Sequence, residues 1–175
     1  MSPPEKETNP LSMGLLFFAC IIAFFFAGKI FGNGGSKLVG QSAPTIDLPL
    51  LTSEASFSTN AHHGKPILID FWASWCGPCR MQAPIVDHVA EMFEKDGLVV
   101  IGVNTSDAEG DARAYLKNHK FSYPIAFDGD RSVASSYGVT SFPTMVLIDK
   151  DGKVKAVRSG VTSADTLASL VRDVL

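Results

Sequence analysis

The sequence predicts an α/β domain in which helices flank a central mixed β-sheet. Short apolar runs that are typical of buried strands alternate with segments of helical periodicity, which favours strand–helix–strand units. Near the C-terminus two strand-like runs instead follow each other across a turn, which indicates an antiparallel hairpin in the same sheet. With 175 residues, 46% of them apolar, the chain can form the core of one such domain and an additional segment.

The additional segment is N-terminal. Residues 1–10 are polar and proline-rich, which predicts a disordered tail. Residues 11–28 carry no charge and would span about 27 Å as a helix, close to the roughly 30 Å hydrocarbon core of a bilayer. Because the preceding flank is not basic and a good cleavage site is missing, an uncleaved transmembrane helix over residues 11–31 is favoured over a signal peptide. A flexible linker over residues 32–40 then leads to a folded domain at 41–175.

The domain is predicted to begin with a strand and an amphipathic helix. Residues 67–72, "ILIDFW", form an apolar run after a turn-like segment, which predicts a buried strand. Residues 77–95 predict a helix kinked at Pro84. Apolar residues recur along it at helical spacing: Ile85, Val86, Val89, Met92 and Phe93. The apolar run at 98–103 predicts the second buried strand.

The middle of the domain is predicted to contain two shorter helices around a strand. Ser106 and Glu109 resemble a capping box, which favours a helix over residues 108–119. A short apolar strand is expected at 123–128, and a short helix at 131–137.

The last elements are a hairpin and a helix. Residues 144–149 predict a strand, the "KDG" sequence at 150–152 a turn, and residues 154–158 the partner strand. Helical periodicity over residues 163–174 predicts a closing helix.

Two of the chain's three cysteines, Cys76 and Cys79, follow the first predicted strand at the start of the first predicted helix. Free backbone N–H groups and the helix dipole stabilise an anion there, so a thiolate at Cys76 forms more easily than usual. Cys79 lies one helical turn further on, close enough to attack a mixed disulfide at Cys76. Pro78 fits the first turn because its missing N–H is not needed there. The arrangement favours thiol–disulfide chemistry.

Two other uses of this pair have less support. A zinc clip needs four ligands, and residues 41–175 contain neither a third cysteine nor a suitably spaced histidine pair. A purely structural disulfide across two intervening residues would remove little entropy from the unfolded chain.

Asp70 is the further residue that points to chemistry. It lies inside the apolar run at 67–72, six residues before Cys76. Burying an unpaired carboxylate is unfavourable, so its pKa should rise. A buried acid of raised pKa near Cys79 could take and return the proton of that thiol. The alternative is a residue at the end of the strand in contact with water.

Several stretches of the sequence resemble one family. "ILIDFWASWCGPC" resembles the active-site stretch of the thioredoxin superfamily, and "GVTSFPTMVLIDKDGKV" resembles its second signature, a proline before a core strand. The N-terminal span, the lead-in "SAPTIDLPLLTSEASFSTNAHHGKPILIDFW" and the insertion around residues 108–128 resemble the membrane-anchored TlpA/ResA-like branch. The resemblance implies a thioredoxin-like fold. It also implies thiol–disulfide exchange on the outer face of the cytoplasmic membrane, often in cytochrome c or oxidase assembly.

The resemblance assigns the chemistry to three residues. Cys76 would be the attacking thiol, Cys79 the resolving thiol, and the pair would form the redox-active disulfide. Asp70 matches the buried aspartate of thioredoxin and would assist proton movement at Cys79.

A second group of residues would contact the substrate. Pro143 resembles the family's cis-proline, beside which the backbone holds the substrate chain, and Phe142 would line that surface. The residue types alone predict only a turn before a strand there, since cis bonds are a minority even for proline. Gly77 and Pro78 form the dipeptide that thioredoxin uses. Trp75 would shape docking, or would alternatively be a partly exposed ring that covers the core.

Three positions depart from the family pattern. Gln82 stands where ResA-like proteins usually carry a glutamate, so acid–base work would fall on Asp70 alone. The lysine that accompanies thioredoxin's buried aspartate is missing from the strand at 98–103. Thr144 follows the proline where the branch dedicated to cytochrome c maturation has an acidic residue, so no single substrate is implied.

The sequence therefore predicts a membrane-tethered thiol–disulfide oxidoreductase that reduces disulfides of exported proteins. A membrane thiol-electron donor of the DsbD/CcdA type is the implied partner, with no cofactor and no metal. The formal net charge of −3 and the lack of a basic block argue against nucleic acid as a partner. We expect a monomer in the bacterial inner membrane with its domain on the periplasmic or extracytoplasmic side, although the few lysines near the span do not fix that orientation.

Two alternative functions stay open. One is a disulfide-forming oxidase of the same fold, and the other is a non-catalytic binding or chaperone module with a structural Cys76–Cys79 pair. A peroxidase is disfavoured because Ala73 stands where the peroxide-binding threonine would be.

Overall fold

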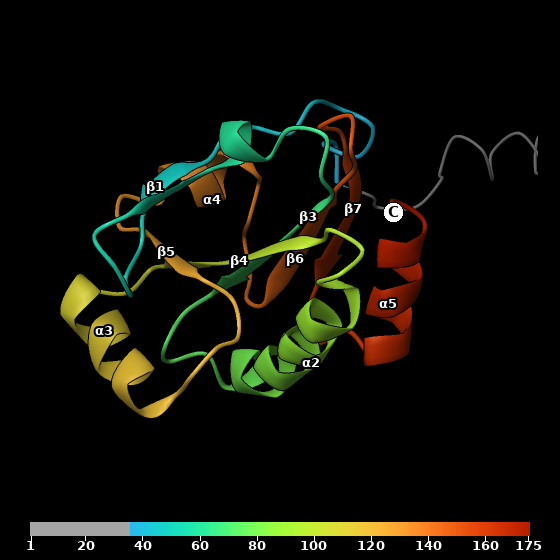
Figure 1. Ribbon diagram of the computed structural model, residues 1–175. Helices are drawn as coiled ribbons and strands as arrows, with labels where there is room; N and C mark the ends of the chain where they lie inside the picture. The colour runs from blue at the N-terminus through green and yellow to red at the C-terminus, as the bar shows by residue number, and fades with distance from the viewer. Residues whose placement is uncertain (1–35) are drawn as a thin grey trace, which may run out of the picture. The chain divides into compact units, whose positions relative to one another are not determined.

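A computed structural model of the protein describes residues 36–175. Their centre is a five-stranded sheet made of β3 (Ile67–Trp72), β4 (Val99–Thr105), β5 (Ile125–Asp128), β6 (Thr144–Ile148) and β7 (Val154–Ser159). The strands lie in the order β5-β4-β3-β6-β7 (Figure 1). β3 pairs in parallel with β4 and antiparallel with β6, while the outer pairs are parallel for β4–β5 and antiparallel for β6–β7. The predicted mixed sheet is therefore confirmed.

Helices and a small hairpin cover the two faces of this sheet. In chain order these elements are β1 (Asp47–Pro49), β2 (Ser56–Ser58), the 3₁₀ helix η1 (Thr59–His62), α2 (Gly77–Phe93), α3 (Glu109–Asn118), α4 (Ser132–Ser136) and α5 (Ala164–Arg172). Buried residues of α2, α3 and α5 form one core cluster with one face of the sheet. Residues of the β1–β2 hairpin and α4 form a second cluster with the other face. Figure 1 shows α2 and α5 side by side on their face.

β3 is the central strand and is buried on both faces. Its residues alternate between the two clusters, with Leu68 and Trp72 on the α2 face and Ile69 and Phe71 on the α4 face. The same alternation places Asp70 on the α2 face. The end of β3 and the start of α2, where the CxxC sequence lies, are thus fixed by two layers of packing.

Residues 42–50, which we call the N-terminal strap, reach both edges of the sheet. Ser42 forms an antiparallel bridge with Lys153 beside β7, and Leu50 forms one with Ala126 of β5. Buried apolar residues between these points pack on the α4 face. The β1–β2 hairpin was not predicted, because each strand has only three residues and shows no readable alternation of apolar and polar side chains.

The remaining predicted elements are confirmed with bounds that shift by at most two residues. Two details of the predicted helices are wrong. Ser106 does not cap α3; it takes a left-handed conformation with φ 67°, and Ala108 precedes the helix without a side-chain cap. Met92 is 43% exposed rather than core-facing, because α2 buries the stripe formed by Cys79, Gln82, Val86, Val89 and Phe93.

The predicted disordered tail at 1–10, the transmembrane helix at 11–31 and the first linker residues, 32–35, lie outside the described residues. Within residues 36–175 no helix is both long enough and apolar enough to cross a bilayer. The described linker residues contact the domain, since the Gly40 N–H donates to the Val154 carbonyl at 2.8 Å.

Candidate active site

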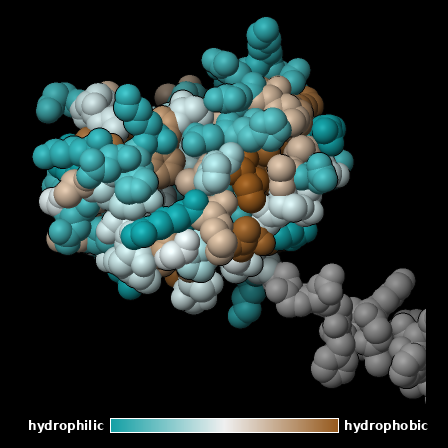
Figure 2. Space-filling model, turned by 90° about the horizontal axis from the view of Figure 1, so that it is seen from below, coloured by the Kyte–Doolittle hydropathy of each residue, from teal (hydrophilic) through white to brown (hydrophobic). Residues whose placement is uncertain are grey.

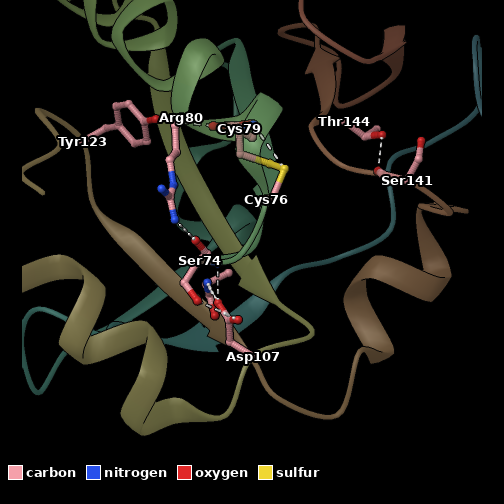
Figure 3. The surroundings of a disulfide bond; sticks show 10 residues. Ser74, Cys76, Cys79, Arg80, Asp107, Tyr123, Ser141 and Thr144 are labelled. Carbon is pink, nitrogen blue, oxygen red and sulfur yellow. Dashed lines mark hydrogen bonds between the residues drawn. A yellow bond between two sulfur atoms is a disulfide. The ribbon is translucent and has the colours of Figure 1, made fainter.

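The structure joins Cys76 and Cys79 in a disulfide at the N-terminus of α2 (Figure 3). Cys76 is the N-cap residue, and its sulfur accepts a hydrogen bond from the Cys79 N–H at 3.1 Å. Pro78 lies in the first turn, as predicted, where no N–H is required. The same N–H would stabilise a thiolate on Cys76 after reduction, so the backbone favours the nucleophilic form of this residue.

Only one of the two cysteines lines a surface pocket. Cys76 and Cys79 are 4% and 5% exposed, so both residues are recessed. Cys76 lines a surface pocket of about 360 Å³, together with Gly77 and Pro78, whereas Cys79 does not. A substrate sulfur in this pocket would therefore reach Cys76 first.

Two aromatic rings border the same pocket. Trp75 is 62% exposed and meets Phe142 edge-on, with ring centroids 5.9 Å apart. The indole N–H of Trp75 donates to the Ser106 carbonyl at 3.3 Å. The Phe142–Pro143 peptide bond is cis, as the resemblance implied. Of the predicted contact residues, Trp75, Gly77, Pro78 and Phe142 thus line the pocket beside Cys76, whereas Pro143 is not among its lining residues.

Exposed apolar side chains are sparse on the described domain. Figure 2 shows one of its faces, on which small hydrophobic patches lie among hydrophilic and intermediate residues. In residues 36–175 the large apolar side chains that remain exposed are few: Val39, Trp75, Met81, Met92 and Val161. Two of them, Trp75 and Met81, lie within two residues of the cysteine pair in the sequence.

Asp70 is buried, as predicted, with 2% of its surface exposed. Burial raises the pKa of Asp70 to about 7, and the nearby Asp87 contributes in the same direction. The hydrogen bond from Tyr123 acts against this shift and lowers the pKa. The Tyr123 hydroxyl donates to Asp70 Oδ2 at 3.4 Å. Because Asp70 faces α2, this acid lies on the side of β3 that carries Cys79.

Asp107 holds the loop that leads into the cysteines, and sequence reasoning missed it. Its carboxylate accepts the Ser74 N–H at 2.7 Å, the Ser74 hydroxyl at 3.0 Å and an Asn104 amide N–H at 2.7 Å (Figure 3). The Arg80 guanidinium donates to the Ser74 carbonyl at 3.3 Å. The loop before Cys76 is therefore tied to the end of β4. The available signal was a polar cluster after an apolar strand, which the capping-box interpretation absorbed.

Arg131 is a second pocket residue that the sequence did not indicate. It adopts a left-handed conformation with φ 62° before α4 and places a cation at the pocket that contains Cys76. Nothing in the local sequence distinguishes it from other surface arginines. Among residues 36–175, no three His, Cys, Asp or Glu side chains are grouped as a metal site would require.

Gln82, the departure noted in the sequence, has a structural contact. It is fully buried in α2, and its Oε1 accepts the Thr162 N–H at 2.7 Å. An amide cannot titrate in this range, so Gln82 joins α2 to the loop before α5 without taking part in proton transfer.

A mixed sheet with a disulfide at the N-terminus of a helix and a cis-proline directly before β6 defines a thioredoxin-like thiol–disulfide oxidoreductase. The Redoxin family matches residues 38–174, so the chain belongs to that family. Within it, the similarity to ResA described next confirms the predicted TlpA/ResA-like branch.

Known relatives and solved structures share this architecture. The thiol-disulfide oxidoreductase ResA of Geobacillus thermodenitrificans is 27% identical over 153 residues, 87% of each chain. The thioredoxin-like protein YneN of Bacillus subtilis is 33% identical over 124 residues, 69% of this chain and 71% of that protein. The thioredoxin domain of a thiol-disulfide oxidoreductase from Bacteroides vulgatus aligns with a TM-score of 0.67 and 29% identity, covering 77% of this chain and 96% of that one. The homologues and the cysteine pair support thiol–disulfide exchange as the activity.

Proposed function

We propose that the protein is a membrane-tethered reductase that transfers electrons to disulfides of exported proteins. The observation that carries this proposal is the asymmetry of the cysteine pair. Both cysteines are almost fully buried, but Cys76 lines the pocket and its sulfur receives a backbone N–H, while Cys79 does not line the pocket. One sulfur is thus suited to attack a substrate, and the other to resolve the product.

The exchange proceeds in two steps. The Cys76 thiolate attacks one sulfur of a substrate disulfide, a Cys76–substrate disulfide forms, and the other substrate sulfur leaves as a thiolate that takes up a proton. Cys79 then loses its proton to Asp70 and attacks the Cys76 sulfur, which releases the second substrate thiolate. Two electrons pass from the protein to the substrate, and the Cys76–Cys79 disulfide remains. Asp70 suits this task because its pKa of about 7 lies near physiological pH.

Trapping tests the assignment of the two cysteines. Cys79→Ala should accumulate mixed disulfides with substrates, because Cys76 still attacks and nothing releases the product. The matched variant Cys76→Ser should accumulate none and should lose insulin reduction. Unchanged insulin reduction by Cys76→Ser would contradict the mechanism, whereas a wild-type protein that does not reduce insulin would favour a non-catalytic module.

The direction of electron flow is tested by the reduction potential. A reductase should have a potential near the roughly −270 mV of thioredoxin, and a disulfide-forming oxidase one near about −120 mV. A value at the oxidising end would overturn the proposed direction and leave the exchange chemistry in place.

The proposed location is the bacterial inner membrane, with the domain on the periplasmic or extracytoplasmic side. The uncharged segment at 11–28 supports a membrane anchor. The resemblance of the sequence to the TlpA/ResA-like branch is the basis for proposing work in the assembly of cytochrome c or oxidases. Electrons would come from a membrane thiol donor of the DsbD/CcdA type. Alkaline phosphatase fused after Leu175 should be active in cells if this topology holds, and inactivity would contradict it.

A further inference from the structure

Tyr123 contacts the buried acid of the site from a distant part of the chain. Its hydroxyl donates to Asp70 Oδ2 at 3.4 Å across a sequence separation of 53 residues. Tyr123 and Asp70 are 6% and 2% exposed, so water competes little for this bond. The other carboxyl oxygen, Asp70 Oδ1, has no hydrogen-bond partner among residues 36–175. One oxygen of this carboxyl group therefore accepts a hydrogen bond, and the other does not.

A glycine makes this approach possible. Gly102 of β4 lies opposite Asp70 in the strand register. A Cβ atom at Gly102 would lie 3.1 Å from Tyr123 Cε2 and 2.5 Å from Ile125 Cδ1. Real side chains do not tolerate the second distance, so any other residue at 102 would displace Ile125 and press on the Tyr123 ring.

The segment that carries Tyr123 is itself fixed. Phe121 packs edge-on against Tyr123 with centroids 5.4 Å apart, and it also packs on Trp72 of β3 at 5.3 Å. Between them, the N–H and hydroxyl of Ser122 both donate to Asp87 of α2 at 2.7 Å. The position of the Tyr123 hydroxyl is thus set by contacts to both β3 and α2. Figure 3 shows that hydroxyl pointing toward the Cys79 side of the view.

The charges around Asp70 do not provide a competing partner. On α2 the charged neighbour is Asp87, which is acidic as well. The residues paired with Asp70 on the adjacent strands are Gly102 and Met145, which carry no charge. Within the described residues, Tyr123 is therefore the side chain that orients this carboxyl group through a hydrogen bond.

We propose that Tyr123 is a positioning residue for thiol–disulfide exchange: it engages Oδ2 of Asp70 and leaves Oδ1 to receive the proton of Cys79. This inference rests on the role proposed above for Asp70. It assigns a function to a residue outside both cysteine and proline signatures, within the segment between α3 and β5.

The test removes one hydroxyl group. Tyr123→Phe keeps the ring and its packing, and Tyr137→Phe is the matched control, since the buried Tyr137 hydroxyl donates to the Pro44 carbonyl on the other face of the sheet. In the oxidised full-length protein, ¹³C NMR reports the titration midpoint of Asp70. The midpoint should rise by about 0.5–1 pH unit in Tyr123→Phe, because a bond that favours the carboxylate is lost, and stay unchanged in Tyr137→Phe. The pH profile of kcat/KM for substrate reduction should move with it.

The outcomes separate the inference from the proposed function. Equal midpoints in wild type, Tyr123→Phe and Tyr137→Phe would overturn the inference. A midpoint that moves while the kcat/KM profile stays in place would contradict the role proposed for Asp70, and with it the positioning role. Tyr123→Met, which also lacks the hydroxyl, provides a second variant and should shift the midpoint in the same direction. In an Asp70→Asn background, Tyr123→Phe should cause no further change in the profile.

Discussion

The carboxyl group of Asp70 opposes folding whenever it is ionised, because it is held out of water without a cation beside it. Burial raises its pKa from the ordinary 3.8 to about 7 in the folded protein. Both states are protonated below about pH 4, and both are ionised well above pH 7. Between these limits the folded state binds the extra proton, so the stability of the protein falls as the pH rises.

We predict that Asp70→Asn removes this pH dependence. The free energy of unfolding of the oxidised wild type should fall relative to that of Asp70→Asn between about pH 4 and about pH 7, by on the order of 4 kcal/mol. Urea unfolding at a series of pH values measures the difference. Parallel stability curves would show that Asp70 is ionised normally in the folded state.

Asp107 provides a second prediction for a single residue. Asp107→Ala leaves the Ser74 N–H and the Asn104 amide without their acceptor, which should lower the free energy of unfolding by about 1–3 kcal/mol. It should also lower kcat/KM, because the loop before Cys76 loses its tie to β4. Asp111→Ala, at an exposed position of α3, is the control and should have little effect. Equal effects of both substitutions would contradict the proposed tie.

Local sequence was sufficient for some of these residues and not for others. The placement of Cys76 and Cys79 at the helix start and the burial of Asp70 were predictable, because the strand, the turn and the helix start that define their environment are contiguous. Asp107 and Tyr123 act on partners 33 and 53 residues away, and nothing in their own neighbourhood indicates those partners. Hydrogen bonds of this kind depend on the sheet register, which the amino-acid pattern does not specify.

At the scale of elements, α2 is anchored by a polar contact as well as by its apolar stripe. Gln82 is wholly buried, and its Oε1 accepts a hydrogen bond from the Thr162 N–H in the loop before α5. Helical periodicity predicted α2 itself, since apolar residues recur along one side. It could not predict that a polar residue belongs to the buried stripe, which requires knowing that a backbone N–H faces it.

We predict that Gln82→Ala separates α2 from the α5 loop. The free energy of unfolding should fall by about 2–4 kcal/mol, from an unpaired buried N–H and the space left by the side chain. Met81→Ala, one position earlier and 59% exposed, should change it by less than about 0.5 kcal/mol. Chemical denaturation of both variants at one pH provides the comparison, and equal losses would count against the contact.

At the scale of the whole molecule, the redox state and the stability of the fold are linked. When a disulfide is hard to reduce, the oxidised folded protein is more stable than the reduced one. In the strong oxidant DsbA the reduced form is the more stable of the two. If the protein is a reductase, the oxidised form should therefore melt at a higher temperature than the reduced form. Thermal unfolding with and without a reducing agent measures this, and Cys76→Ser, which cannot form the bond, should show no difference. A reduced form that melts higher would favour the oxidase.

The overall architecture was largely predictable, because alternating strands and helices followed by a hairpin permit few arrangements. The N-terminal strap was not. Its strands are too short to show a pattern, and its place is fixed by bridges to Ala126 and Lys153, far along the chain.

That strap has a consequence for how the protein behaves among unfolded polypeptides. An open sheet border can accept a strand from another chain, which is the first step toward fibrils. Here one border is occupied through Leu50 and the other through Ser42, and the rest of β7 bears the charged side chains of Lys155 and Arg158. Each bridge shortens the stretch of free strand border with which another chain could pair, which disfavours strand-by-strand aggregation of this domain.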